Sequence, residues 1–153
     1  MDETPERLHQ LVMDLIRAAG MLAPDQLMPG GQLTMSQAFA VHELDIDRPL
    51  SQRELAERLH LEKSSVSRMV AEMERKELVV RERDPANRRF YRLRLTDAGR
   101  ALHRGIARAM HEHFVRSVSA MSELERDALL TGLPALIRAM RADTFRTDPA
   151  DAP

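Results

Sequence analysis

The 153-residue sequence contains no cysteine and no tryptophan, and only five of its residues are aromatic. The absence of cysteine excludes disulfide bonds, thiolate metal sites and thiol nucleophiles. So few aromatic rings leave little material for the stacking platforms on which proteins bind single-stranded nucleic acid. With 43% hydrophobic residues, a chain of this length can still bury an apolar core without cross-links.

Long apolar runs and catalytic motifs are also missing. No segment approaches the run of about 20 apolar residues that a membrane span requires. Three of the first six residues are acidic, whereas the start of a signal peptide is basic, so we expect a cytoplasmic protein without membrane contact. The sequence has no phosphate-cradling glycine loop and no evident Ser–His–carboxylate or paired-carboxylate arrangement, and we therefore expect neither enzymatic activity nor a cofactor.

The six histidines do not predict a metal site. His111 and His113 are two positions apart and point to different faces of a helix, unlike ligands spaced by three or four. His103 and His111 can share a face, but about two helical turns separate them. We interpret the histidines as solvated or interface residues and expect no bound metal.

Charge is unevenly distributed along the chain. The totals nearly cancel, with 23 Lys and Arg against 24 Asp and Glu. Residues 51–95, however, hold 12 basic and 8 acidic residues, an excess of four positive charges. The flanking segments carry an excess of five negative charges. A basic centre of this kind favours a polyanionic partner, which the net charge alone would argue against.

Apolar spacing and a capping box mark the first helices. An apolar residue recurs every third or fourth position from about residue 5 to 22, which predicts an amphipathic helix. Residues 23–33, with two prolines and two glycines, interrupt it. Thr34 and Gln37 form a capping box that begins a second helix, running through Leu44.

The next two segments predict a helix-turn-helix unit. Ser51 and Glu54 form a stronger capping box, which begins a short helix. Only about three or four residues separate that helix from a second one at 63–76, the spacing of two helices joined by a tight turn. Their inward faces consist of apolar residues at helical spacing: Leu55, Ala56 and Leu59, then Val66, Met69, Val70 and Met73.

A basic hairpin is expected directly after this unit. Residues 78–83 and 89–95 read as strands, joined by a turn at Asp84–Asn87. A hairpin in this position is called a wing. Residues 78–95 contain six arginines against only Glu82 and Asp84, so the wing is strongly basic.

The last third of the chain predicts two more helices. Thr96 caps a long helix, and a capping box at Ser122–Glu125 begins a final one. Gly132 and Pro134 are expected to kink or interrupt the final helix. The tail, 144–153, is expected to be frayed.

Short polar side chains on the segment 63–76 suggest a surface that approaches DNA. Ser64, Ser65 and Ser67 are small enough to come close to a sugar-phosphate backbone, and the N-terminal amides of a helix favour a phosphate oxygen. Arg68 is placed to reach a base edge or a phosphate. The alternative is an ordinary surface helix whose serines only assist its start.

The turn of the predicted wing carries two adjacent arginines. Arg88 and Arg89 are candidates for entering a minor groove, where the negative potential attracts a planar cation. The alternative is a solvated hairpin edge that its charges protect from aggregation. For Arg92 and Arg94 we favour that alternative, with phosphate contact at most.

These motifs together resemble the core of the MarR family of transcriptional regulators. The resemblance covers about residues 51–100 and is carried by LAERL at 55–59, KSSVSRMV at 63–70, Leu78-Val79, RDPANRR at 83–89 and LRLTDAGR at 93–100. It implies an obligate homodimer in which the first and the last two helices dimerise. It also implies a recognition helix in the major groove, with contacts from Ser64, Ser65, Ser67 and Arg68. A wing that reaches the minor groove through Arg89 is implied as well.

Two positions depart from the family pattern. Asn87 stands where the family often has Asp two residues before the wing arginine, so an Asp–Arg pairing is lost or becomes a neutral hydrogen bond. Glu77 stands where a glycine commonly ends the recognition helix. A left-handed ending would strain a glutamate, so we expect this helix to close differently.

The resemblance also raises the question of a small aromatic or anionic effector. Candidates for its site are Met13, Arg17, Met35, Phe39 and His42. Ten methionines would suit an adaptable cavity, but methionine at helical spacing is more often plain core filling, and we favour that interpretation.

The expected protein is mainly α-helical with a small two- or three-stranded antiparallel wing. Its predicted parts are a dimerisation helix and linker (1–33), a winged helix-turn-helix domain (34–95), C-terminal dimerisation helices (96–143) and the tail. We predict a sequence-specific regulator, more readily a repressor, that binds double-stranded DNA as a homodimer on a pseudo-palindromic operator. The alternative from another class is a winged-helix module that binds protein and never contacts DNA.

Overall fold

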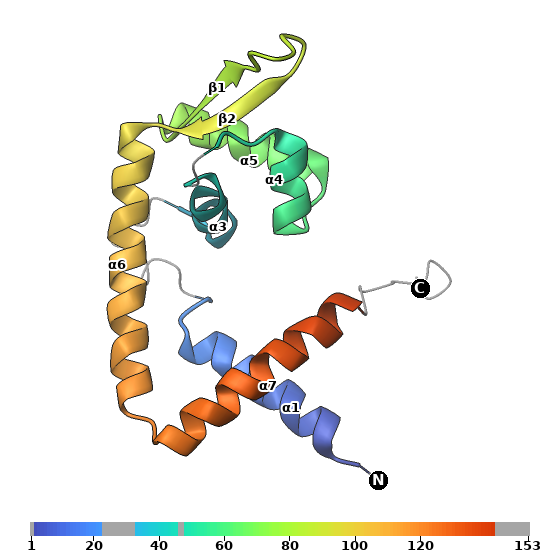
Figure 1. Ribbon diagram of the computed structural model, residues 1–153, viewed down its shortest axis with the longest axis vertical. Helices are drawn as coiled ribbons and strands as arrows, with labels where there is room; N and C mark the ends of the chain where they lie inside the picture. Colours follow the sequence, from blue (N-terminus) through green and yellow to red (C-terminus); the bar gives the residue numbers. More distant parts are fainter. Residues whose placement is uncertain (1, 23–32, 46–47, 143–153) are drawn as a thin grey trace. The chain divides into compact units, whose positions relative to one another are not determined.

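The computed structural model describes residues 2–22, 33–45 and 48–142 (Figure 1). The elements in these segments are, in chain order, α1 (Thr4–Ala18), α3 (Met35–Leu44), α4 (Gln52–Leu59), α5 (Lys63–Arg75), β1 (Val79–Arg83), β2 (Tyr91–Leu95), α6 (Asp97–Ser119) and α7 (Glu123–Ala142). This confirms a mainly α-helical fold with a small antiparallel wing. The chain is organised in two units, Met1–Met110 and His111–Pro153.

The helix starts follow the capping residues of the sequence. At the start of α3, Thr34 Oγ1 accepts the Gln37 amide at 3.2 Å, and the Gln37 side chain accepts the Thr34 amide at 3.2 Å. Ser51 and Glu54 make the same reciprocal pair at the start of α4, at 3.1 and 2.8 Å. The predicted capping box before α7, at Ser122–Glu125, is also present.

The first helix ends earlier than its apolar spacing predicts. α1 stops at Ala18 instead of continuing to about residue 22. Gly20 adopts a left-handed backbone with φ of 70°, and the amide of Met21 donates to the carbonyl of Ile16 at 3.2 Å. This arrangement terminates a helix, and glycine adopts it without strain. Of the predicted break at 23–33, all but Leu33 lies outside the described residues.

The tight turn between α4 and α5 is confirmed. His60 follows α4 with a left-handed backbone, φ 53°, and the Leu61 amide donates back to the Ala56 carbonyl at 3.1 Å. These bonds satisfy carbonyls at the helix end and reverse the chain, so that α5 begins at Lys63. All four residues of the predicted inward stripe of α5 are buried.

The end of α5 differs from the sequence expectation. Glu77 does take the left-handed backbone, φ 58°, although it is not glycine. The Leu78 amide donates to the Met73 carbonyl at 3.0 Å, and the Thr96 hydroxyl donates to the Glu77 carbonyl at 2.7 Å. Such a conformation costs a non-glycine residue about 1–2 kcal/mol. The two hydrogen bonds offset that cost, so the helix closes as a glycine would have closed it.

The wing is a two-stranded antiparallel hairpin. β1 and β2 pair in a register that sets Val79 opposite Leu95 and Arg83 opposite Tyr91. Leu50 adds an isolated bridge to Leu93, in which the two residues exchange backbone hydrogen bonds of 3.2 and 2.6 Å. The sequence allowed two or three strands, and the structure has two strands plus this single-residue bridge.

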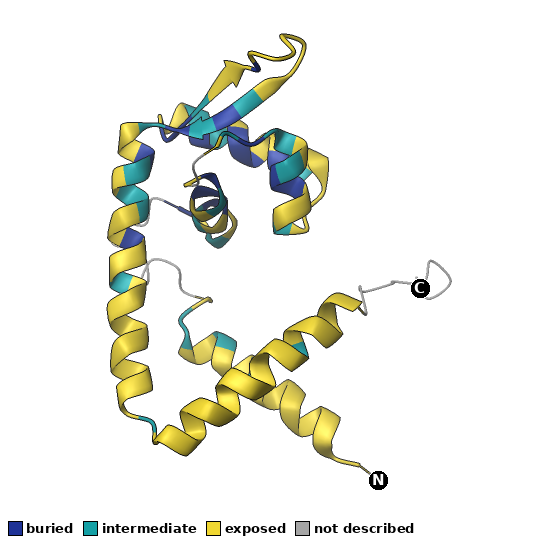
Figure 2. Cartoon of the chain, viewed as in Figure 1, coloured by how far each residue is buried: buried dark blue, intermediate teal, exposed yellow. Residues whose placement is uncertain are grey.

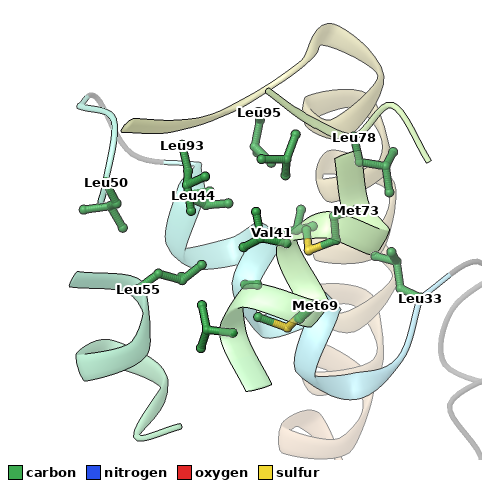
Figure 3. Packing of buried hydrophobic residues seen from close by; sticks show 14 of the residues in the cluster. Leu33, Val41, Leu44, Leu50, Leu55, Met69, Met73, Leu78, Leu93 and Leu95 are labelled. Atoms are coloured by element: carbon green, nitrogen blue, oxygen red, sulfur yellow. The ribbon is translucent and has the colours of Figure 1, made fainter. Parts of the chain in front are cut away.

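A single apolar cluster joins these elements in the first unit (Figure 3). It is formed by Leu33, Ala40, Val41, Leu44, Leu50, Leu55, Ala56, Val66, Met69, Val70, Met73, Leu78, Val79, Leu93, Leu95 and Ile106. The cluster therefore draws on α3, α4, α5, both strands and α6. Met69 and Met73 are buried in it, which supports core filling for these two methionines.

The remaining helices are almost entirely exposed (Figure 2). Neither α1 nor α7 contains a buried residue, and α6 has none after Ile106. The sequence predicted that Gly132 and Pro134 would kink or interrupt the final helix. The predicted interruption is wrong, because α7 is continuous through both residues. Proline removes one hydrogen-bond donor, and the carbonyl it frees lies on an exposed helix where water can bind it.

We expect Gly99→Ala to destabilise the first unit, because a Cβ atom there would lie 2.2 Å from the Leu78 carbonyl oxygen. The loss in the free energy of unfolding should be about 1–3 kcal/mol, the usual cost of overpacking. Gly105→Ala, on the same helix, is the matched control. Its Cβ would meet nothing within 4 Å, and it should raise stability by about 0.5–1 kcal/mol. Urea unfolding measures both, and equal effects would contradict the close approach at Gly99.

Candidate nucleic-acid interface

The first turn of α5 presents a polar surface opposite its buried stripe. Ser64, Ser67 and Arg68 are exposed and Ser65 is half-buried, while Val66 is fully buried. The residue before the helix, Glu62, makes no side-chain hydrogen bond to the first-turn amides. These amide groups are therefore not capped by that side chain, which is the arrangement that attracts an anion to a helix N-terminus.

The turn of the hairpin exposes two cations. Arg88 and Arg89 are both exposed, and within the described part of the chain their guanidinium groups form no ion pair. Asn87 Oδ1 accepts the backbone amide of Arg89 at 3.2 Å, and the Asn87 carbonyl accepts the amide of Phe90 at 3.0 Å. The side chain of Asn87 thus bonds the backbone of Arg89 and not its guanidinium, so the Asp–Arg type of pairing is lost, one of the two outcomes that the sequence left open.

A third arginine holds this turn from the end of β1. Arg83 donates from Nη1 to the carbonyl oxygen of Arg88 at 2.6 Å. Its guanidinium carbon lies 4.7 Å from the centroid of the Tyr91 ring, the geometry of a cation–π contact. Arg83 therefore connects the two sides of the turn that carries Arg88 and Arg89.

Asp84 is the central acceptor of the wing. Its residue exposure is only 8%, and its carboxylate accepts the Ala86 amide at 2.8 Å and Arg92 Nε at 2.8 Å. The Asp84 amide donates to the Phe90 carbonyl at 2.9 Å. The Arg92 guanidinium, followed by the Ala86 amide, holds the pKa of Asp84 below its ordinary value.

Arg92 makes a second ion pair that leaves the hairpin. Its Nη1 donates to Oε2 of Glu54 at 3.1 Å. The Ser51 backbone amide, followed by the Arg48 guanidinium, lowers the pKa of this carboxyl against the opposing effect of partial burial. Arg92 is thus paired internally, whereas the sequence favoured a solvated edge. Arg94 pairs with Glu82 and stays within the hairpin.

The five candidate effector residues lie on two helices. Met13 and Arg17 are exposed on α1, where Arg17 pairs with Asp14. Met35, Phe39 and His42 are spaced by four and three residues, and so lie along one side of α3. Phe39 and His42 are exposed, and Met35 is half-buried. The structure therefore groups three of the five on a single helix.

A histidine pair connects α3 to α6, which the sequence did not reveal. His42 Nδ1 lies 3.1 Å from Nε2 of His103, and Nδ1 of His103 pairs with the Asp45 carboxylate. No local motif relates residues 61 positions apart. Among the residues that the structure describes, no group of three or more metal-binding side chains is placed to hold a metal ion. None of the described helices combines the length and hydropathy that a membrane span requires.

Known protein families and solved structures resemble this chain over more residues than the sequence motifs cover. The MarR family model matches residues 33–90. FabT of Streptococcus pneumoniae, solved in complex with DNA, is 19% identical with a TM-score of 0.82, over 90% of this chain and 97% of that one. RV1404 from Mycobacterium tuberculosis is 25% identical with a TM-score of 0.72, over 91% and 95%. The PcaV transcriptional regulator from Streptomyces coelicolor, solved with its natural ligand, is 22% identical with a TM-score of 0.68, over 91% and 96%.

A comparison with curated protein sequences finds no match. The fold and the solved structures nevertheless define the class, a winged helix-turn-helix protein. Over residues 33–90 the chain matches the model of the MarR family, and it shares the fold of these solved structures. The family-model match agrees with the resemblance drawn from the motifs.

We expect the stability of the chain to depend on the Asp84 charge at neutral but not at acid pH. Because its pKa is lower in the folded chain, the stabilisation is complete above the ordinary carboxyl range of about pH 4 and is lost as pH falls through the folded pKa. Asp84→Asn should lower the free energy of unfolding at neutral pH and converge on the wild type in acid. Urea unfolding across this range measures the effect, with Asp127→Asn on the exposed α7 as the control. A deficit that persisted unchanged in acid would contradict a role for the charge.

Proposed function

We propose that the chain is a sequence-specific regulator that binds a pseudo-palindromic operator as a homodimer. The observation that carries this proposal is that one folded unit presents both a polar surface on α5 and wing arginines that form no ion pair with any described residue. The match of the MarR family model over residues 33–90 supports the same function.

In this proposal α5 enters the major groove. Ser64, Ser65 and Ser67 contact the sugar-phosphate backbone, and Arg68 reaches a base edge. The buried stripe on the opposite side of α5 anchors the helix, so the polar residues are presented by a fixed element and not by a loop. The excess of positive charge in residues 51–95 attracts the duplex.

The wing supplies the second contact. Arg88 and Arg89 extend from the turn and enter the adjacent minor groove, where planar cations are favoured. The support is their exposure and their lack of an internal ion pair among the described residues. Since Arg83 and Asp84 hold the turn through hydrogen bonds, the two arginines are held in place before DNA arrives.

Dimerisation is proposed to involve α1, the second half of α6, and α7. These helices expose a set of large apolar residues that one chain leaves in water: Leu8, Leu11, Met13, Leu15, Met110, Phe114, Val115, Val118, Leu124, Leu129, Leu130, Leu133, Ile137 and Met140. Exposed apolar surface on this scale marks a protein interface. A twofold dimer presents two copies of α5 to half-sites about one helical turn, roughly 10 bp, apart.

Repression in the cytoplasm is the simplest outcome of such binding, because a dimer that occupies a promoter blocks it without further machinery. We further propose that a small effector adjusts DNA affinity through Met13, Arg17, Met35, Phe39 and His42. The shared side of Met35, Phe39 and His42 on α3 supports this site. PcaV, a structural neighbour, was solved with its natural ligand.

Arg89→Ala is expected to weaken DNA binding while leaving the fold intact, because the side chain is exposed. Arg68→Ala should cost about 1–3 kcal/mol and relax the preference at one base pair if Arg68 reads a base. Arg104→Ala, which removes the same charge from the exposed side of α6, is the matched control. Gel shifts with the DNA flanking its own gene, over a series of salt concentrations, measure the affinity and its salt slope.

The same measurement separates the two classes of function. Failure of the wild-type chain to bind any promoter fragment at low salt would favour the protein-binding module. Unchanged affinity in Arg89→Ala would remove the wing from the interface. A loss in Arg68→Ala that is uniform across sequences would make Arg68 a phosphate contact.

The full chain is expected to have twice the mass of one chain in solution, measured by light scattering after size exclusion. Leu130→Glu should shift it toward the monomer, because a charge would replace an apolar residue on the exposed α7. Phe90→Ser, which removes an exposed apolar residue from the wing, should leave the mass unchanged. A strictly monomeric wild type would contradict the dimer.

A further inference from the structure

A chain of three charged side chains links the wing to the start of the helix-turn-helix. Arg92 is the middle member, bonded to Asp84 at 2.8 Å and to Glu54 at 3.1 Å. Asp84 directly follows β1, and Glu54 lies in the first turn of α4. The planar guanidinium uses different nitrogen atoms for the two carboxylates, so it bridges them in one fixed geometry.

The two carboxylates are themselves held by backbone amides. Oδ1 of Asp84 accepts the Ala86 amide within the wing turn, and Oε2 of Glu54 accepts the Ser51 amide at the start of α4. The side chains are 33% exposed for Arg92, 32% for Glu54 and 11% for Asp84. Arg92 therefore joins two rigid backbone features, and partial burial reduces the screening of its charge.

Among the described residues, the only other ion pair between the hairpin and a helix joins Arg81 of β1 to Glu74 of α5 at 3.0 Å, opposite Leu93. The hairpin's buried apolar residues, Val79, Leu93 and Leu95, all lie at the end nearest the core, where Leu50 also bridges to Leu93. Beyond Leu93, the aromatic residues Phe90 and Tyr91 are exposed. A two-stranded hairpin is marginally stable by itself. The part of the hairpin beyond Arg81 and Leu93 is thus attached to the helices through Arg92.

We propose that Arg92 is a positioning residue for DNA binding, which fixes the wing turn against α4 and so sets where Arg88 and Arg89 lie relative to α5. This inference rests on the proposed function, in which those arginines contact the minor groove. Arg92 acts through the turn and does not contact DNA itself. Its effect on affinity therefore exists only while the wing arginines contribute to binding.

Arg94 provides a comparison within the same strand. It lies two positions from Arg92 on β2 and is also paired with a carboxylate, that of Glu82. Glu82 belongs to β1, so this pair stays inside the hairpin and does not attach it to α4. Arg92→Gln and Arg94→Gln remove the same charge from the same strand, but only the first removes the link to α4.

The test measures the affinity of the full chain for an operator duplex by fluorescence anisotropy. Arg92→Gln is expected to weaken binding about tenfold, and Arg94→Gln should have a much smaller effect. Arg92→Lys keeps the charge but lacks the planar fork, so it should behave like Arg92→Gln. In a background that already carries both Arg88→Ala and Arg89→Ala, Arg92→Gln should cause little further loss, because the contacts through which it acts are absent.

A second measurement needs no DNA. Hydrogen exchange at the Ala86 amide, and at the other amides of the turn, should be faster in Arg92→Gln than in the wild type and unchanged in Arg94→Gln. Thermal unfolding of each variant checks that the fold is retained. Amide exchange therefore reports how firmly the wing is attached to α4, independently of whether the wing contributes to DNA binding.

Three results would overturn the inference: equal losses in the two glutamine variants, full affinity in Arg92→Lys, or an undiminished effect of Arg92→Gln in the background that lacks both Arg88 and Arg89. Unchanged amide exchange in Arg92→Gln would overturn it even where the wild type binds DNA normally. Absence of DNA binding by the wild type would instead contradict the proposed function, and with it the role of Arg92 in DNA binding.

Discussion

Burial of one apolar cluster holds together elements that have little stability alone. α4 has eight residues and α3 has ten, shorter than helices that persist in water by themselves. The two-stranded hairpin is similarly marginal. Each of them supplies side chains to the same cluster, so each is ordered by the others. The polar side of α5 is fixed in space because its opposite side, including Val66 and Met73, is the centre of this packing.

Ion pairs within the fold decide which of the many arginines remain available to a partner. The basic character of residues 51–95 does not identify a binding surface, because Arg53, Arg58, Arg81, Arg92 and Arg94 each have an acidic partner. The basic residues of this segment without an acidic partner among the described residues are Lys63, Arg68, Arg75, Arg83, Arg88 and Arg89. They lie in two places, on α5 and on the wing. The structure thus narrows a broad charge excess to a few side chains.

Local signals in the sequence were sufficient for most of the fold. Capping boxes at Thr34, Ser51 and Ser122 identified the starts of three helices, because their hydrogen bonds join residues only three positions apart. The strand boundaries were also close, within two residues of β1 and β2. The end of α1 was missed although Gly20 was visible, because the apolar spacing continued to about residue 22 and outweighed the glycine. The ending at Glu77 was missed because it depends on Thr96, a residue from a distant part of the chain.

The contacts that sequence could not reveal are those between side chains far apart along the chain. Arg92 could be recognised as part of a basic strand, but its pairing with Glu54 requires the fold to bring β2 beside α4. Apolar spacing has a related limit, because it predicts that a helix has an apolar side without saying what covers that side. In α5 the stripe packs against the same chain, whereas the spacing in α1 produces a helix without a buried residue. The same pattern therefore occurs both in a helix that packs into the core and in a helix that stays exposed, and only the structure distinguishes the two.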